Sequence, residues 1–184
     1  LLAGFWQMVD KQKPRLVTWN GRSFDVAVLK QRSLIHGLTA YQWHRNDPRY
    51  GYDYRYEVNW HCDLMEVFSD NGASPHLSLD EVAWALGLPG KWNGHGAEVA
   101  EQATTGNYTA INRCFEGDVL NIFVLYLRWA YFSTRMTAHG HNASIRNLLE
   151  YLERKRGEHT RCGEFADRWQ SSDRPCPLFV NELL

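Results

Sequence analysis

The hydrophobic pattern of the first 37 residues predicts a helix, a buried strand and a second helix. Residues 1–13 carry apolar side chains three or four positions apart, which is the spacing of one helix face. Residues 15–19 form a short apolar run with β-branched and aromatic side chains, which is typical of a buried strand. Asn20-Gly21 is a turn signal, and Ser23 is placed to cap a helix that Gly37 ends. A helix, a strand, a turn and a helix in this order indicate an α/β fold.

Residues 41–60 interleave aromatic and basic side chains, and we expect a long excursion with an edge strand at residues 54–58. The aromatic residues of this stretch are Tyr41, Trp43, Tyr50, Tyr52, Tyr54, Tyr56 and Trp60. Two interpretations are open. The rings form a surface on which single-stranded bases stack, each base contributing on the order of 1–3 kcal/mol. Alternatively, many of them are ordinary core and edge-strand residues.

The second half of the sequence predicts helices. Residues 78–81 read Ser-Leu-Asp-Glu, a capping box that opens a helix ending at Gly87. After a Gly-rich loop, a helical stretch follows in which residues 118–132 are apolar nearly all round, so we expect them to form the central buried helix. Residues 142–169 form a charge-mixed helical region. The last dozen residues contain two prolines, and we expect them to form a loose tail.

Composition narrows the class of protein. The chain has 184 residues, of which 44% are hydrophobic and 22% are charged, so disorder and a coiled coil are excluded. This length predicts one domain over residues 1–170, followed by the tail over residues 171–184. With 20 Lys and Arg against 21 Asp and Glu, no global charge attracts the chain to nucleic acid or to a membrane. Any groove that binds nucleic acid is therefore local.

Cysteine usage and hydropathy indicate the compartment. The four cysteines are scattered and form no CxxC pair, which argues against a zinc site and for reduced thiols in a cytoplasmic protein. The sequence contains no apolar run of about 18 residues, so we expect no membrane-spanning helix. Together these features predict a cytoplasmic location.

Two aspartates occupy positions that favour a function. Asp118 lies on a helical stripe of apolar residues, where an unpaired carboxylate costs several kcal/mol unless a metal, an arginine or a proton neutralises it. A buried salt bridge or a local helix cap would also explain it. Asp25 follows the first strand closely and lies in the first turn of its helix, on the side of Val28 and Leu29. The carboxyl ends of strands build sites in α/β sheets, although the helix dipole also favours an acidic first turn.

Four segments of the sequence resemble motifs of a known family. Residues 18–25, Thr-Trp-Asn-Gly-Arg-Ser-Phe-Asp, resemble the second motif, N-x-x-x-F-D, of DEDD-type 3′–5′ exonucleases. Residues 113–121 resemble the third motif, in which a helix carries the last metal-binding Asp. Residues 61–65 and 86–91 are similar to a bacterial branch related to the exonuclease domain of family B DNA polymerases. The resemblance implies a ribonuclease H-like fold, a mixed sheet flanked by helices, with a helix-rich C-terminal half.

The resemblance also implies a reaction, the hydrolysis of phosphodiester bonds at the 3′ end of single-stranded DNA. Two Mg²⁺ or Mn²⁺ ions, about 3.5–4 Å apart, activate a water and stabilise the leaving 3′ oxygen in such enzymes. Asp25 and Asp118 match two of the four carboxylates that bind these ions. The positions matched to substrate binding are Asn20, Arg22, Phe24 and Asp63. For Asp63 a structural role is the alternative.

Two departures from the family pattern bear on activity. The first motif, D-x-E on an early strand, is absent, because Asp10 is the sole acidic residue before Arg15. We therefore expect an N-terminally truncated domain whose first strands are missing. Cys114 occupies the position of the catalytic tyrosine that orients the attacking water, and a thiol is a weak hydrogen-bond donor. We expect this chain to bind Mn²⁺ weakly and to be inactive.

Two other functions stay open at this point. The chain could be a nuclease-like module that holds nucleic acid without cutting it. It could instead be a structural or interaction domain that keeps Asp25 and Asp118 for polar core contacts. Oligonucleotide binding with a steep salt dependence separates these two possibilities.

Overall fold

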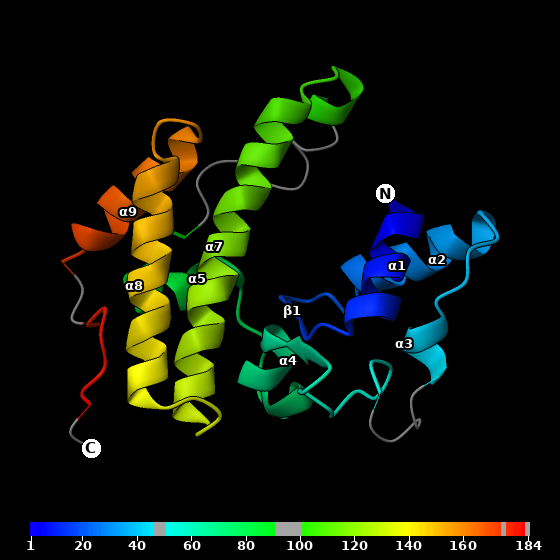
Figure 1. Cartoon of the computed structure of the whole chain (residues 1–184), viewed down its shortest axis with the longest axis horizontal. Coiled ribbons are helices and arrows are strands. Elements are labelled where there is room, and N and C mark those ends of the chain that lie inside the picture. Colours follow the sequence, from blue (N-terminus) through cyan, green and yellow to red (C-terminus); the bar gives the residue numbers. More distant parts are fainter. Residues whose placement is uncertain (46–50, 91–100, 174–175, 183–184) are drawn as a thin grey trace. The chain divides into compact units, whose positions relative to one another are not determined.

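The computed structural model describes residues 1–45, 51–90, 101–173 and 176–182, apart from the side chains of residues 110, 113, 114 and 160. The chain, coloured along its sequence in Figure 1, divides into two compact units, residues 1–77 and 78–184. The predicted domain of residues 1–170 therefore includes the first unit and most of the second. Among the described helices, none has the length and apolar character needed to cross a membrane.

The first unit combines a small sheet with short helices (Figure 1). Its elements are α1 (Leu2–Gln12), β1 (Leu16–Thr18), α2 (Asp25–Ile35), α3 (Tyr41–Arg45), β2 (His61–Asp63), α4 (Leu64–Phe68) and the 3₁₀ helix η1 (Asp70–Gly72). β1 and β2 are parallel, and Thr18 pairs with Asp63. Parallel strands need a crossover connection, and here the chain passes through α2 and α3 between them. The pairing places the end of β2 beside the residues that follow β1.

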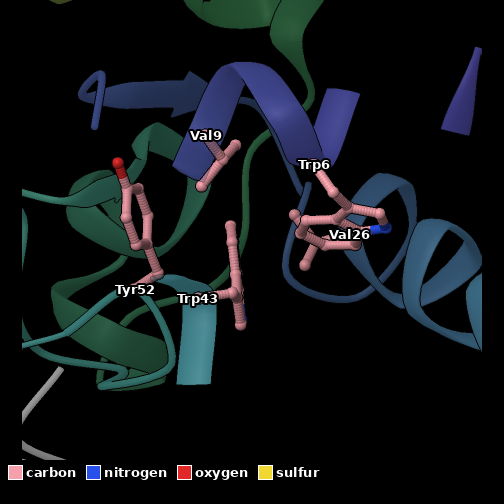
Figure 2. Packing of buried hydrophobic residues seen from close by; sticks show 5 residues of the cluster. All are labelled: Trp6, Val9, Val26, Trp43 and Tyr52. Atoms are coloured by element: carbon pink, nitrogen blue, oxygen red, sulfur yellow. The ribbon is translucent and has the colours of Figure 1, made fainter. Parts of the chain in front are cut away.

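A cluster of aromatic and aliphatic side chains forms the core of the first unit. Its buried members are Trp6, Val9, Val26, Trp43 and Tyr52. Figure 2 shows these side chains gathered in one region, from α1, α2, α3 and the segment between α3 and β2. The rings of Trp43 and Tyr52 stack with their centroids 4.9 Å apart, and Trp6 meets Trp43 edge to face at 5.6 Å. This ring packing fixes α1 and α3 against each other.

The aromatic residues of the 41–60 stretch divide between core and surface. Trp43 and Tyr52 are 2% and 0% exposed, so the interpretation as core residues is confirmed for these two. Tyr41 and Tyr56 are 53% and 61% exposed, and an arginine guanidinium group lies over each ring. Tyr50 lies outside the described residues. Tyr54 and Trp60 are half-buried, so Tyr41 and Tyr56 are the exposed candidates for base stacking among the described residues of this stretch.

The predicted edge strand at residues 54–58 is wrong. The chain forms turns there, as in the backbone hydrogen bond of 3.2 Å from Glu57 N to Tyr54 O. The second strand comes later, at His61–Asp63, where all three residues are buried. Alternating aromatic residues imitated a strand pattern, whereas the strand itself is specified by its pairing with β1.

The second unit is helical in its described part. Its helices are α5 (Leu79–Ala85), α7 (Tyr108–Phe132), α8 (Ala138–Lys155) and α9 (Thr160–Gln170). The predicted capping box is confirmed, because Ser78 Oγ accepts from Glu81 N while the Glu81 carboxylate accepts from Ser78 N. α7 and α8 lie side by side (Figure 1). Side chains with no exposed surface fill the space between the helices, among them Leu125, Ile145, Leu152 and Phe165.

The C-terminal part of the second unit differs from the prediction in two ways. The helical region expected over residues 142–169 is two helices, and the first begins at Ala138, where Thr137 Oγ1 accepts from Gly140 N. The prediction of a loose tail is wrong for residues 176–182, because this segment forms hydrogen bonds with α7 and α8.

The predicted fold class holds at a coarse level. The described residues are helix-rich and contain a two-stranded parallel sheet, with the order of helix, strand and helix that is typical of α/β proteins. The ribonuclease H-like mixed sheet stays a prediction.

Candidate active site

The turn between β1 and α2 holds three of the predicted site residues, Asn20, Arg22 and Phe24, and it leads directly into a fourth, Asp25, the first residue of α2. Asn20 has a φ of 61°, in the left-handed region that Asn adopts more readily than most residues. A Cβ on Gly21 would lie 2.5 Å from the Thr18 side chain, so a larger residue does not fit there. A backbone hydrogen bond of 2.8 Å from Val26 N to Gly21 O leads into α2. The Asn20-Gly21 turn signal is thus confirmed.

The carboxylate of Asp63 holds this turn in place. Its Oδ1 accepts from Asn20 N at 2.8 Å, and its Oδ2 accepts from Arg22 N at 2.9 Å. Oδ1 also accepts from Met65 N at 3.3 Å, so that Asp63 caps α4 as well. The residue is 2% exposed and pairs with Thr18 in the sheet, which brings its side chain to the end of β1. These bonds give Asp63 a structural role in the turn.

Burial and hydrogen bonding act on Asp63 in opposite directions. Burial raises the pKa of Asp63 above its ordinary value, and the bonds from Arg22, Asn20 and Met65 lower it only in part. Glu66 nearby adds to the rise. Taking this carboxylate out of water is therefore unfavourable, and the three backbone donors offset part of that penalty.

The guanidinium group of Arg22 also belongs to the framework of the turn. Its Nη2 donates to Tyr54 O at 3.1 Å and to His61 O at 2.9 Å. Burial lowers the pKa of Arg22, while the charges of Asp63 and Glu66 act in the opposite direction. Arg22 thus ties the turn to β2 and to the segment before it, and the substrate contact that the sequence predicts for it stays a prediction.

His61 is a buried member of the site that the motif contained but to which the sequence assigned no role. The residue has no exposed surface, and its Nε2 lies 2.9 Å from Thr18 Oγ1. Burial, together with the charges of Arg22 and Lys30, lowers the pKa of His61 to about 3, so the imidazole is neutral near pH 7. Its Nδ1 has no hydrogen-bond partner within the described part of the chain. The burial of His61 depends on packing and has no signal in the sequence.

Phe24 and Asp25 face the solvent at the start of α2. Phe24 is 64% exposed, and Asp25 is also exposed. The sequence predicts that Asp25 lies beside the apolar residues Val28 and Leu29. For Val28 the prediction of a buried neighbour is wrong, because this residue is itself 43% exposed. The predicted cap Ser23 is wrong too, since Phe24 is the N-cap residue. An exposed ring can stack on a base, and the exposed carboxylate beside it can bind a hard cation.

Asp118 lies on α7 in the second unit, on the apolar stripe that the sequence predicts. Ile111, Leu125 and Trp129 of this stripe are at most 9% exposed, whereas Asp118 is half-buried. Close by along α7, Asn121 is fully buried and donates from Nδ2 to Gly90 O at 2.9 Å. The side chain of Cys114, which the sequence places at the catalytic tyrosine position, lies outside the described residues.

The four motifs and the turn between β1 and α2 are consistent with one family. A sequence model described as a predicted 3′–5′ exonuclease related to the exonuclease domain of PolB matches residues 1–169. The chain belongs to this exonuclease family. The match includes every predicted site residue of the exonuclease, from Asn20 to Asp118, and it confirms the resemblance at the level of the family. Neither a curated protein nor a solved structure matches the chain.

Exonucleases of this type generally use divalent metal ions, and the donors of this chain fit such ions in part. Within the residues that the structure describes, no three His, Cys, Asp or Glu side chains lie close enough together to hold a metal ion. Asp25 in the first unit and Asp118 in the second each offer carboxylate oxygens, the ligands that hard cations prefer. Two carboxylates offset less charge than the four that the resemblance implies for two ions. Each unit therefore carries one of the carboxylates that the resemblance matches.

Proposed function

We propose that the chain acts in 3′–5′ exonuclease chemistry on the 3′ end of single-stranded DNA, with Asp25 and Asp118 as ligands of Mg²⁺ or Mn²⁺. The observation that carries the proposal is the turn between β1 and α2. There, the exposed Phe24 ring and the exposed Asp25 stand at the end of a backbone segment that the buried Asp63 holds. Membership of the exonuclease family supports the reaction type.

The residues of the turn have separate roles in this proposal. Phe24 stacks on the terminal base, a contact worth on the order of 1–3 kcal/mol. Asn20 hydrogen-bonds to the terminal nucleotide, and Asp25 holds a cation near the scissile phosphate. When bound, the divalent ions activate a water and stabilise the leaving 3′ oxygen. Arg22 and Asp63 position the turn, since their polar groups are engaged by the backbone.

The metal ligands can be tested one at a time. We expect Asp25→Asn and Asp118→Asn each to weaken Mn²⁺ binding by about fivefold, which is about 1 kcal/mol, because each loses one charged ligand. Binding is measured by electron paramagnetic resonance of free Mn²⁺. Asp173→Asn, an exposed aspartate near the C-terminus, is the matched control and should bind as the unaltered chain does. Unchanged binding in both Asp25→Asn and Asp118→Asn would exclude the proposed ligands.

We further propose that this chain alone does not cut DNA. It contains two of the four carboxylates that the resemblance implies, and Cys114 replaces the tyrosine that orients water. A labelled single-stranded oligonucleotide incubated with the chain and Mn²⁺ should keep its length. Rapid shortening that a chelator abolishes would contradict this part of the proposal and leave the assignment of the ligands intact.

A nuclease-like module that binds without cutting is the second candidate function. Two observations favour it, the exposed Tyr41 with Arg45 over its ring and the exposed Tyr56 with Arg55 over its ring. Tyrosine rings and guanidinium planes are the groups on which single-stranded bases stack. In this case, Tyr41→Ala and Tyr56→Ala lower the affinity for an oligonucleotide, and that affinity falls steeply with salt even without metal. Oligonucleotide binding that requires Mn²⁺ and is unchanged by both substitutions argues for the first candidate, the metal-dependent exonuclease.

A further inference from the structure

Residues 176–182, here called the C-terminal segment, run beside α8 in the second unit (Figure 1). The segment forms neither helix nor strand. It lies beyond residue 169, where the family match ends. The exonuclease family therefore does not account for the contacts that hold the segment, and they do not depend on the proposed function.

Asn142 of α8 makes the central contact. Its Nδ2 donates to Val180 O at 2.9 Å, and its Oδ1 accepts from Val180 N at 2.9 Å. One side-chain amide thus pairs with both backbone groups of a single residue, the same exchange that residues of a β-ladder make. Nδ2 also donates to Glu182 Oε1 at 2.8 Å. Asn142 is 4% exposed, so these partners replace the water that its amide would otherwise bind.

His141 sets the orientation of this amide. It has no exposed surface, and its Nδ1 lies 3.1 Å from Asn142 Oδ1. Burial lowers the pKa of His141, so the ring is neutral near pH 7 and carries one proton. With that proton on Nδ1, the ring donates to Oδ1 and thereby holds Oδ1 where it accepts from Val180 N. The amide is oriented by its own helix, independently of the C-terminal segment.

Two further contacts of the C-terminal segment are polar and near the surface. Arg128 of α7 donates to Pro177 O, and His139 Nδ1 lies 3.7 Å from Glu182 Oε2. Phe179, the largest apolar side chain of the segment, is 40% exposed. Since a hydrogen bond contributes about 1 kcal/mol net, the segment can open locally while the helices stay folded. Opening uncovers an oriented amide, flanked by Arg128 and His139.

We propose that Asn142, Arg128 and His139 form a docking site for an acidic peptide. The site recognises one residue by both of its backbone groups and an acidic side chain two positions later. In the isolated chain residues 176–182 occupy it, as Val180 and Glu182 show. A peptide of this kind in another chain competes with the C-terminal segment for the same donors and acceptors.

The occupancy of the site is tested in the full chain by hydrogen exchange. Val180 N–H should exchange about tenfold or more slowly than in the free peptide of residues 176–182, because it is bonded to Asn142. Asn142→Ala should abolish this protection. Asn147→Ala, which changes an exposed asparagine of the same helix, should leave it unchanged. Exchange of Val180 at the free-peptide rate in the unaltered chain would overturn the proposal.

Docking from outside is tested with a chain whose own segment cannot pair. Val180→Pro removes the N–H that Asn142 accepts and leaves Asn142 intact. This variant should bind the labelled peptide of residues 176–182 about tenfold more tightly than the unaltered chain, in which the tethered segment competes. Adding Asn142→Ala should remove the gain, and adding Asn147→Ala should keep it. Equal binding by the unaltered chain and Val180→Pro, or a gain that survives Asn142→Ala, would contradict the docking site.

Discussion

The turn after β1 and the helix α7 each carry one predicted metal ligand, but different kinds of contact hold them. In the turn, the hydrogen bond from Asn20 to Asp63 links residues 43 positions apart, and the bond from Arg22 to His61 links residues 39 positions apart. On α7, Asp118 takes its place from the helical repeat of the apolar stripe. A site in the turn therefore depends on residues that are distant in the sequence, whereas the position of Asp118 follows from its own helix.

The largest effect that this difference predicts is a loss of stability of the first unit in acid. The pKa of His61 is lowered to about 3 by burial and by the charges of Arg22 and Lys30. Between about pH 6.5 and 3 the unfolded chain binds a proton that the folded chain does not bind. The free energy of unfolding of the first unit is therefore highest above about pH 6.5. It falls by about 1.4 kcal/mol per pH unit as the pH drops, by about 5 kcal/mol in all.

This pH dependence is measured by unfolding the chain in urea at pH 7 and at pH 4. Hydrogen exchange of the β1 and β2 amides reports the unfolding of the first unit. His61→Gln should reduce the slope, since glutamine does not titrate. Asp63 acts in the opposite direction, because a raised pKa gives stabilisation that is present below the ordinary pKa and lost as the pH rises. Because Asp63 is present in both proteins, the difference in slope between the unaltered chain and His61→Gln is due to the histidine. An identical slope in the two proteins would show that His61 does not cause the loss of stability in acid.

A somewhat smaller effect is expected from Asp63→Ala, about 3 kcal/mol of the free energy of unfolding of the first unit. The substitution leaves the backbone N–H groups of Asn20 and Arg22 without an acceptor, and each such loss costs about 1–3 kcal/mol. Asp63→Asn keeps one acceptor oxygen and should recover roughly half. The matched control is Asp25→Ala, which removes an exposed carboxylate and should change the stability by less than about 1 kcal/mol. Equal stability of the two alanine variants would refute the claim that Asp63 holds the turn.

The smallest effect concerns a local contact in the second unit. Ser78→Ala removes the side chain that caps α5 and should lower the stability of that unit by about 1 kcal/mol. Glu81→Gln preserves a capping box and should have less effect than Ser78→Ala. Thermal unfolding followed by circular dichroism measures both. A loss after Ser78→Ala as large as that after Asp63→Ala would contradict the contrast between local and long-range support.

The parts of the fold that could be predicted are those with local signals. The capping box at Ser78 and the Asn20-Gly21 turn are specified within four residues, and both are found. The edge strand at residues 54–58 was wrong because alternating aromatic residues suit a strand only where a partner strand is available. Pairing with β1 determines that the second strand forms at residues 61–63, and no local sequence pattern indicates this pairing.

The candidate site divides in the same way. Motif resemblance identifies Asp25, Asp118 and the position of Asp63 from the sequence. The hydrogen bonds by which Asp63 holds the turn, and the burial of His61, arise only when β2 lies beside β1. Likewise, the two prolines near the C-terminus suggested a loose tail, because the pairing of Val180 with Asn142 leaves no trace in local composition.

The proposed function depends above all on Asp25, at the start of α2, binding a divalent cation. The most direct measurement is the broadening of backbone amide signals by Mn²⁺ in nuclear magnetic resonance. We predict that substoichiometric Mn²⁺ broadens the amides of Phe24, Asp25 and Val26 first, and that Asp25→Asn removes this effect. If these three signals stay sharp, or if they broaden equally in Asp25→Asn, the turn is not a metal-binding site.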